Sequence, residues 1–211
     1  MDTIKSKYHE TLAATVIKNL EKRQMEGYYC PTVEDAEKLA FSFLKDGQNV
    51  SFGGSMTLEE TGMLTALRHD PSIHLIDRST AKTTEETKKM YHDALSSDVY
   101  FMSTNAITTN GELVNIDGTG NRVAALIYGP ETVIILAGMN KIAANVDEAL
   151  SRVHNVATAQ NCIRLGKKTP CAITGVCADC LSPDCICNQV VITRRSGIKG
   201  RIKVLLIGES F

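Results

Sequence analysis

The chain has 211 residues, a formal net charge of −1, a hydrophobic fraction of 43% and a charged fraction of 22%. This composition suits one globular α/β domain over residues 1–211, and it offers no basic stripe for nucleic acid. Its apolar runs fall far short of the ~20 residues that span a bilayer, and residues 1–7 lack the apolar segment of a signal peptide. We therefore expect a cytoplasmic protein with no membrane partner; the oligomeric state cannot be predicted.

The first third of the chain predicts helices that alternate with strands. A period of four predicts an amphipathic first helix, with its apolar face at Ile4, Tyr8, Leu12, Val16 and Leu20. A short strand over residues 28–30 is followed by a helix that Thr32 can cap. The next strand, residues 49–52, leads through Gly53-Gly54-Ser55 into a helix over residues 58–69, for which Thr57-x-x-Glu60 fits a capping box.

The same alternation continues through the middle of the chain. Residues 72–76 and 98–102 predict strands, and Thr83-x-x-Glu86 is a capping box for the helix between them. Asn110-Gly111 between two semi-apolar runs predicts a β-hairpin with a type I′ turn. Residues 117–122 are too rich in glycine for a helix and are expected to form a loop before a buried strand over residues 131–137.

The last third predicts one long helix from Ile142 to about Leu165, then a cysteine-rich loop and strands over residues 189–193 and 202–207. Strands that alternate with helices indicate βαβ units. The sequence therefore predicts a mostly parallel, Rossmann-like α/β sheet with helices on both faces. A β-hairpin and a cysteine-rich loop at residues 171–187 are inserted in it.

The turn after the second strand predicts an anion site. First-turn N–H groups of a helix lack intrahelical partners, and paired glycines let the backbone come close to a phosphate or carboxylate. Gly53, Gly54, Ser55 and Thr57 are the candidate ligand-binding residues; the alternative is a tight βα turn with a capping threonine. Neither a nicotinamide fingerprint nor a P-loop nucleotide motif is present in the sequence.

A second set of polar residues follows the later strands. The candidate ligand-binding residues here are Asn105, Asn115, Asp117, Gly118, Gly120, Asn121, Arg122 and Lys141. Arg122 could take an anion in bidentate fashion, and Asp117 could be a general base or a brace for its loop. Asp117 and Lys141 are the weak catalytic candidates. Carboxyl ends of parallel strands share one edge, so we expect this set to face the Gly53-Gly54-Ser55 turn across one cleft.

Five of the seven cysteines, Cys171, Cys177, Cys180, Cys185 and Cys187, lie within one short loop. Thiolates at this density repel one another unless a cation shares them, so the loop predicts an iron–sulfur cluster or a zinc ion. Free thiols or redox-active disulfides are the alternatives. Cys30 and Cys162 stand apart and are expected to be small core residues.

Three stretches together carry a family resemblance. The segment AITTNGELVNIDGTGNRVAALIYGPETVIILAGMNKI, the turn Gly53-Gly54-Ser55 and the loop PCAITGVCADCLSPDCICN resemble the lactate-utilisation (LUD) domain family, LutC/YkgG-like, in its cysteine-loop subgroup. The resemblance implies a fold similar to the sugar-phosphate isomerase and CoA-transferase (NagB/RpiA-like) superfamily. It also implies metal ligands at Cys171, Cys177, Cys180 and Cys187, and Cys185 is an extra, alternative ligand.

The resemblance further implies a function beside other proteins. LutC-type subunits work with iron–sulfur partner subunits in the oxidation of L-lactate to pyruvate. The expected role is thus an accessory subunit that binds a small anionic ligand at the strand carboxyl ends; whether the chain is itself an enzyme stays open. The alternatives are a stand-alone enzyme on a sugar phosphate or acyl-CoA, or a non-catalytic binding or regulatory protein with a structural zinc.

Overall fold

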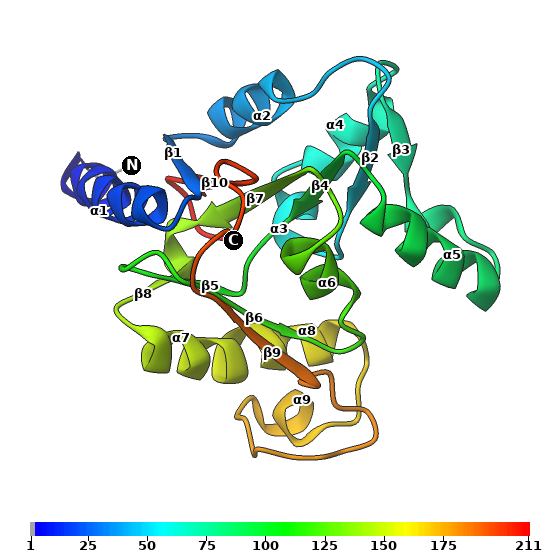
Figure 1. Cartoon of the computed structure of the whole chain (residues 1–211). Coiled ribbons are helices and arrows are strands. Elements are labelled where there is room, and N and C mark those ends of the chain that lie inside the picture. Colours follow the sequence, from blue (N-terminus) through cyan, green and yellow to red (C-terminus); the bar gives the residue numbers. More distant parts are fainter. Residues whose placement is uncertain (1–2) are drawn as a thin grey trace.

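The computed structural model describes residues 3–211 and has two sheets. The larger sheet has six strands in the order β1-β10-β7-β4-β2-β3, and every neighbouring pair in it is parallel. Its strands are β1 (Glu26–Cys30), β2 (Asn49–Phe52), β3 (His74–Ile76), β4 (Val99–Met102), β7 (Thr132–Gly138) and β10 (Ile202–Ile207). The predicted parallel α/β sheet is confirmed, and Figure 1 shows it in the upper part of the molecule.

Helices flank this sheet and continue below it. The α-helices are α1 (Thr3–Lys22), α2 (Val33–Ser42), α3 (Met56–Glu60), α4 (Met63–His69), α5 (Thr84–Leu95), α6 (Asn121–Ile127), α7 (Val146–Arg152), α8 (Ala159–Arg164) and α9 (Pro170–Thr174). Shorter 3-10 turns form η1 (Arg78–Thr80) and η2 (Met139–Lys141), and η3 (Val153–Thr158) is a π-helix. No helix within residues 3–211 is both long enough and apolar enough to cross a membrane.

The core lies on both faces of the larger sheet, because alternate residues of a strand point to opposite faces. In β7, Val133 and Ile135 belong to the apolar cluster that contains α1 and α6. Ile134 and Leu136 belong to the cluster that contains α2, α3 and α4. Strands buried on both faces read as continuous apolar runs, which is why β7 and β10 could be predicted from sequence. Helices on both faces are therefore confirmed.

The smaller sheet was not predicted from the sequence. Its order is β8-β5-β6-β9, formed by β5 (Ala106–Thr108), β6 (Leu113–Asp117), β8 (Ile142–Ala143) and β9 (Gln189–Thr193). One of its faces, through Ile107 and Leu113, packs into the α1 cluster of the main core. The other face, through Val114, packs on α7 and η3, which lie below it in Figure 1. This sheet therefore holds α7, η3 and α8 below the carboxyl edge of the larger sheet.

The hairpin between β5 and β6 is confirmed, but its predicted turn type is wrong. A type I′ turn needs positive φ at both central residues, whereas only Gly111 has positive φ (86°) and Asn110 does not. The Gly111 N–H donates to the Thr108 carbonyl and the Thr108 N–H donates to the Glu112 carbonyl. This pattern is a three-residue loop with a glycine bulge.

Three helix predictions need correction. Residues 58–69 form two helices, because Gly62 adopts a left-handed conformation (φ 72°) between α3 and α4. Ser55, and not Thr57, caps α3 by accepting the Leu58 N–H. The long helix expected from Ile142 is also interrupted, since Ile142 lies in β8 and the helical turns begin only at Val146.

The first helix forms where it was predicted, but its buried stripe shares only Val16 and Leu20 with the predicted apolar face. The buried positions are His9, Ala13, Val16 and Leu20, whereas Ile4 and Tyr8 are exposed. The helix capped by Thr83 also forms as predicted, because the Thr83 hydroxyl accepts the Glu86 N–H. The Glu86 carboxylate instead accepts the Lys82 N–H, so the capping box is only half formed.

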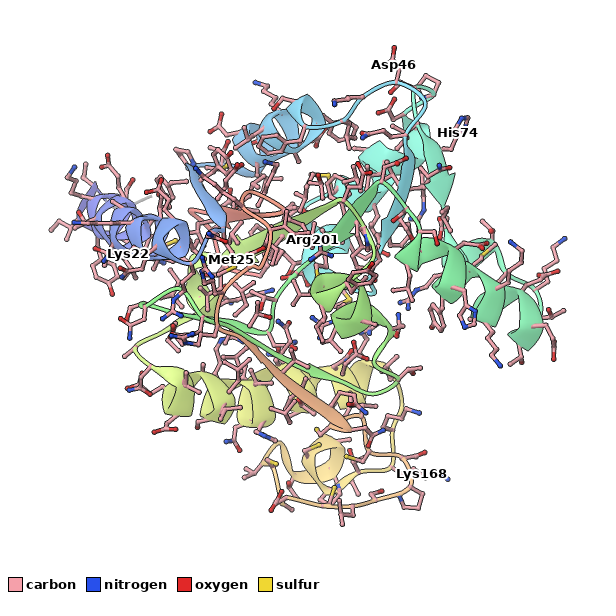
Figure 2. All side chains as sticks on the ribbon, viewed as in Figure 1. Lys22, Met25, Asp46, His74, Lys168 and Arg201 are labelled. Atoms are coloured by element: carbon pink, nitrogen blue, oxygen red, sulfur yellow. The ribbon has the colours of Figure 1, made fainter. Side chains whose placement is uncertain are left out.

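Arg201 fixes α6 to the body of the protein. It lies in the middle of the molecule in Figure 2 and is buried. Its guanidinium donates to the carbonyls of Ala125, Leu126 and Pro130 at 2.7 to 2.8 Å. These carbonyls lie at and beyond the carboxyl end of α6, where intrahelical partners are lacking. The amino end of α6, which begins at Asn121, is thereby held in a fixed position.

Candidate functional site

A cavity of about 840 Å³ lies at the carboxyl ends of β2 and β4. The chain leaving β2 enters α3 on one face of the sheet, and the chain leaving β4 leads through the hairpin to α6 on the other face. Adjacent strands whose connections diverge in this way leave a crevice in open α/β sheets. Its lining includes Gly54, Ser55, Thr57, Asn105, Asp117, Gly118, Asn121, Arg122 and Lys141. The structure thus brings these candidate residues to one cavity.

The remaining ligand-binding candidates from the sequence do not line the cavity but lie next to residues that do. Gly53 packs against Arg122, because an added Cβ would lie 3.0 Å from Arg122 Cγ. Gly120 begins α6 with a left-handed φ of 90°. Asn115 is fully buried in β6, where its Oδ1 accepts from the Asn105 N–H and from Arg122. Its Nδ2 group is buried without a partner among the described residues.

Arg122 organises the floor of the cavity and is not available as a bidentate anion ligand. Nη1 donates to the Ser103 carbonyl at 3.2 Å and to Asn115 Oδ1 at 2.6 Å. Nη2 donates to Asn105 Oδ1 at 3.0 Å and to the Ile116 carbonyl at 2.7 Å. All the Nη hydrogens are therefore used within the protein. The arrangement joins the ends of β4 and β6 and leaves one buried positive charge beneath the cavity.

Asp117 braces the loop that leads into α6. One carboxylate oxygen accepts the Gly120 N–H at 2.9 Å, and the other accepts the Val123 N–H at 3.4 Å. The second oxygen also lies 3.6 Å from Arg122 Nε. Both carboxylate oxygens of Asp117 are thus occupied by groups of its own loop and helix. Of the two roles considered for Asp117, the geometry favours the brace.

This geometry also corrects the predicted loop over residues 117–122. Asn121 and Arg122 lie in the first turn of α6, after Gly120. The carboxylate of Asp117 satisfies amides of this first turn, as a capping residue does. A helix thus begins at a point where the glycines indicated only a loop.

Lys141 places a buried amine in the cavity wall. Its side chain is 8% exposed, and Nζ donates to the hydroxyls of Thr57 and Ser103, the latter at 2.8 Å. Among the described ion pairs none involves Lys141. Burial, with the charges of Arg152 and Arg122, lowers the pKa of Lys141 to about 7, although Glu60 acts in the opposite direction. A fraction of this amine is therefore neutral at physiological pH.

The cavity carries more positive than negative charge. Its basic lining residues are Arg78, Arg122, Lys141, Arg152, Arg164 and Lys167. The acidic side chains among the described lining residues are those of Glu60 and Asp117. A concave site with this balance attracts anions, because the low-dielectric walls concentrate the field.

Two arginines keep free hydrogen-bond donors toward the cavity. Arg152 uses Nη1 on the Asn105 carbonyl and Nε on the Asn140 carbonyl, and within the described chain its Nη2 donates to no residue. Arg78 donates from Nη1 to the Tyr91 hydroxyl, and its Nη2 lies over Gly54. These groups, rather than Arg122, can donate charge-assisted hydrogen bonds to the carboxylate or phosphate of a ligand.

A family model for the LUD domain matches residues 13–207. The chain belongs to the LUD domain family. A solved structure of a DUF162 family protein from Deinococcus radiodurans is similar in fold, with 12% identity and a TM-score of 0.53. That match covers 94% of this LUD chain and 98% of the Deinococcus chain. A search of curated proteins found no match.

Two further matches to this LUD protein are partial. The delta subunit of eIF2B from Chaetomium thermophilum matches at 22% identity and a TM-score of 0.34, over 53% of this chain and 48% of that one. Ribose 5-phosphate isomerase from Plasmodium falciparum matches at 14% identity and a TM-score of 0.33, over 54% of this chain and 52% of that one. Each match thus spans about half of either protein.

The cysteine loop of this LUD protein does not form a metal cage. Cys171 packs with Cys162 in a small buried cluster, and Cys187 packs against the core below the smaller sheet. Cys177 Sγ instead lies 3.7 Å from His154 Nδ1. Within residues 3–211, no three His, Cys, Asp or Glu side chains are gathered as a metal would require. The expected ligands Cys171, Cys177, Cys180 and Cys187 are therefore not gathered as a metal would require in this arrangement.

Several lining residues of the LUD cavity were missed by sequence reasoning. They are Arg78, Tyr91, Ser103, Arg152, Arg164 and Lys167. Ser103 directly follows β4, so its position at a strand carboxyl end was a usable signal. Arg152 lies in α7 and Arg164 in α8, and these helices reach the cavity only because the smaller sheet holds them there. No local pattern in the sequence indicates that placement.

Proposed function

We propose that this LUD protein binds a small anionic metabolite, a 2-hydroxy or 2-keto acid such as lactate or pyruvate, in the cavity between β2 and β4. We further propose that it acts as an accessory subunit, beside iron–sulfur partner subunits, in the oxidation of L-lactate to pyruvate. The lactate role comes from family membership, and the class of ligand from the charge of the cavity.

The observation that carries the binding proposal is the buried amine of Lys141, which lacks a carboxylate partner among the described residues. The ammonium form of a buried amine without a counter-ion is unfavourable unless a ligand supplies the negative charge. The free donors of Arg152 lie on the same lining. A carboxylate between these two residues would satisfy both of them.

Ligand binding is tested by isothermal titration calorimetry with L-lactate, pyruvate, a sugar phosphate and a CoA ester. We expect the hydroxy and keto acids to bind, and Arg152→Met to weaken that binding by roughly tenfold or more, the loss of one charge-assisted bond. Arg23→Met is a matched control, because Arg23 pairs with Glu112 outside the cavity lining. An unchanged affinity in Arg152→Met would contradict the proposed ligand position.

The lactate role is tested by reconstitution. The chain is mixed with candidate iron–sulfur subunits, and pyruvate formation from L-lactate is measured with and without it. We expect turnover to require the chain and to fall when Arg152→Met replaces it. Equal rates of pyruvate formation with and without the chain would contradict the accessory role but not the proposed ligand binding.

The size of the cavity favours a second candidate, a stand-alone enzyme on a sugar phosphate or acyl-CoA. A three-carbon acid fills a small part of 840 Å³, which is within the range of sites for drug-sized ligands. Arg164 and Lys167 add positive charge to the lining from α8 and the segment after it. Tighter binding of a phosphorylated ligand than of lactate, lost in Arg164→Ala, would support this candidate over the first.

A further inference from the structure

Lys141 has the surroundings of an amine nucleophile. It lies in the cavity lining, it is 8% exposed, and its hydrogen-bond partners are the neutral hydroxyls of Thr57 and Ser103. A lysine that serves only as a structural cation is normally paired with a carboxylate when it is buried. Here the charges of Arg152 and Arg122 both disfavour the ammonium form, and Glu60 opposes them only in part. Desolvation together with cationic neighbours is the setting that activates lysine as a nucleophile.

We propose that Lys141 forms a covalent imine with the carbonyl carbon of a 2-keto acid bound in the cavity. This inference rests on the proposed function, because it assumes that a keto acid enters the site. It adds a covalent step that binding alone does not require. Lactate has no carbonyl group, so it would bind beside Lys141 without this bond.

The step needs no further reactant. The neutral amine nitrogen forms a bond to the carbonyl carbon, and one N–H proton passes to the carbonyl oxygen to give a carbinolamine. That oxygen then leaves as water with the second N–H proton, and a C=N bond remains. Ser103 and Thr57 each place a hydroxyl at hydrogen-bond distance from Nζ, so either can carry protons between nitrogen and oxygen.

The lining supplies an anchor for the carboxylate of the same keto acid. Arg152 extends from α7, its Nε and Nη1 are held by backbone carbonyls, and its Nη2 is free of partners in the described chain. A guanidinium held in this way binds a carboxylate at little entropic loss. With the carboxylate on Arg152, the adjacent C2 carbonyl carbon can face Lys141. In this arrangement Arg152 binds the carboxylate, Ser103 or Thr57 transfers protons, and Lys141 is the nucleophile.

The inference is tested by trapping on the full chain. Pyruvate is added with sodium cyanoborohydride, which reduces an imine to a stable amine, and the adduct is located by intact mass and peptide mapping. We expect one adduct per chain, on Lys141, formed faster at pH 8 than at pH 6, where the amine is protonated. L-Lactate under the same conditions should give none.

Two variants sharpen the test. Lys141→Arg keeps the charge but removes the nucleophile, and it should abolish the adduct while circular dichroism shows a folded chain. Ser103→Ala keeps Lys141 and should slow trapping several-fold, so a result is obtained even if the first variant does not fold. Lys168→Arg is the control, because Lys168 is exposed beside the cysteine loop (Figure 2) and should leave trapping unchanged.

The outcomes separate this inference from the function on which it rests. Calorimetric binding of pyruvate without an adduct on Lys141 overturns the imine and leaves the binding site intact. An absence of pyruvate binding overturns the proposed ligand class as well. Adducts spread over exposed lysines at similar yield would show ordinary surface chemistry and would also overturn the inference.

Discussion

Lys141 Nζ lies 2.8 Å from Ser103 Oγ, so an amine from η2 meets a hydroxyl that follows β4. The two residues come from the ends of adjacent parallel strands, because β4 pairs with β7 and η2 continues directly from β7. Carboxyl ends of such strands share one edge of the sheet. The contact therefore depends on the sheet order and not on any local motif.

Replacement of Lys141 should change how stability depends on pH. Its pKa is about 7 in the folded protein, well below the 10.5 of an unperturbed lysine. Between these values the unfolded chain holds a proton that the folded chain lacks, so the free energy of unfolding rises with pH by roughly 1.4 kcal/mol per unit. We expect Lys141→Met to lack this rise. Its unfolding free energy, measured with urea, should therefore compare more favourably with that of the parent protein at pH 7 than at pH 10.

The matched control for this pH series is Lys168→Met, which removes an exposed lysine. Its unfolding free energy should follow that of the parent protein across the whole pH range. Parallel curves for the parent and Lys141→Met would show that the amine is not desolvated in the folded state. That result would weaken the argument for its neutral form in the cavity.

Arg122→Lys should destabilise the fold by about 3 to 5 kcal/mol, the usual effect of breaking a buried charge network. An ammonium cannot replace the Nη groups that bond the Ser103 and Ile116 carbonyls and the two asparagine side chains. Asp117 would also lose its guanidinium partner. Chemical denaturation measures the loss directly.

Arg164→Lys is the matched control for the same substitution, since Arg164 is exposed and, within residues 3–211, its side chain bonds only Asn161 one turn earlier. We expect a change of less than about 0.5 kcal/mol there. A similar small change in Arg122→Lys would mean that the network under the cavity contributes little to stability. Arg122 could then serve the ligand instead.

The larger sheet could be predicted from sequence because its strands are short apolar runs between turn residues. The Gly53 turn, Asn105 and Lys141 follow such strands, so their place at one edge was predictable as well. The burial of Lys141 was not, because it depends on the hydroxyls of Thr57 and Ser103 and on the arginines around it. The ligand role of all these residues stays a prediction.

The start of α6 shows a different limit of sequence reasoning. Gly118 and Gly120 indicate a loop by composition, and the helix after them depends on the carboxylate of Asp117 and on the clamp from Arg201. Arg201 is far away in sequence, so this support cannot be read locally. The prediction that the Arg122 guanidinium is free to bind an anion is wrong for a similar reason, since its acceptors come from β6 and from the segment between β4 and β5.

Gly54→Ala should weaken anion binding with little effect on stability. A Cβ at Gly54 would lie 2.1 Å from Arg78 Nη2, and the other atoms that it approaches also belong to Arg78. Arg78 is the end of a flexible side chain, so it would move away and take its positive charge from this part of the cavity. We expect several-fold weaker binding of pyruvate or phosphate by calorimetry.

Gly197→Ala is the control for Gly54→Ala, because a Cβ there meets no atom within 4 Å. Neither glycine has a positive φ, so both substitutions should be tolerated by the backbone. Equal affinities in the two variants would exclude Arg78 from ligand binding. A large loss of stability in Gly54→Ala would point instead to a structural role for the turn.

The cysteine loop makes a prediction about thiol reactivity that also tests metal binding. In the metal-free chain, Cys177 and Cys180 are partly exposed and should react with iodoacetamide well before the buried Cys30 and Cys171. Burial also raises the pKa of Cys30 to about 11, and the thiolate is the reactive form.

If zinc or an iron–sulfur cluster binds after the loop rearranges, Cys177 and Cys180 should become protected together, with bound metal measured by elemental analysis. Unchanged labelling of both after anaerobic reconstitution, without bound metal, would contradict a metal role for the loop.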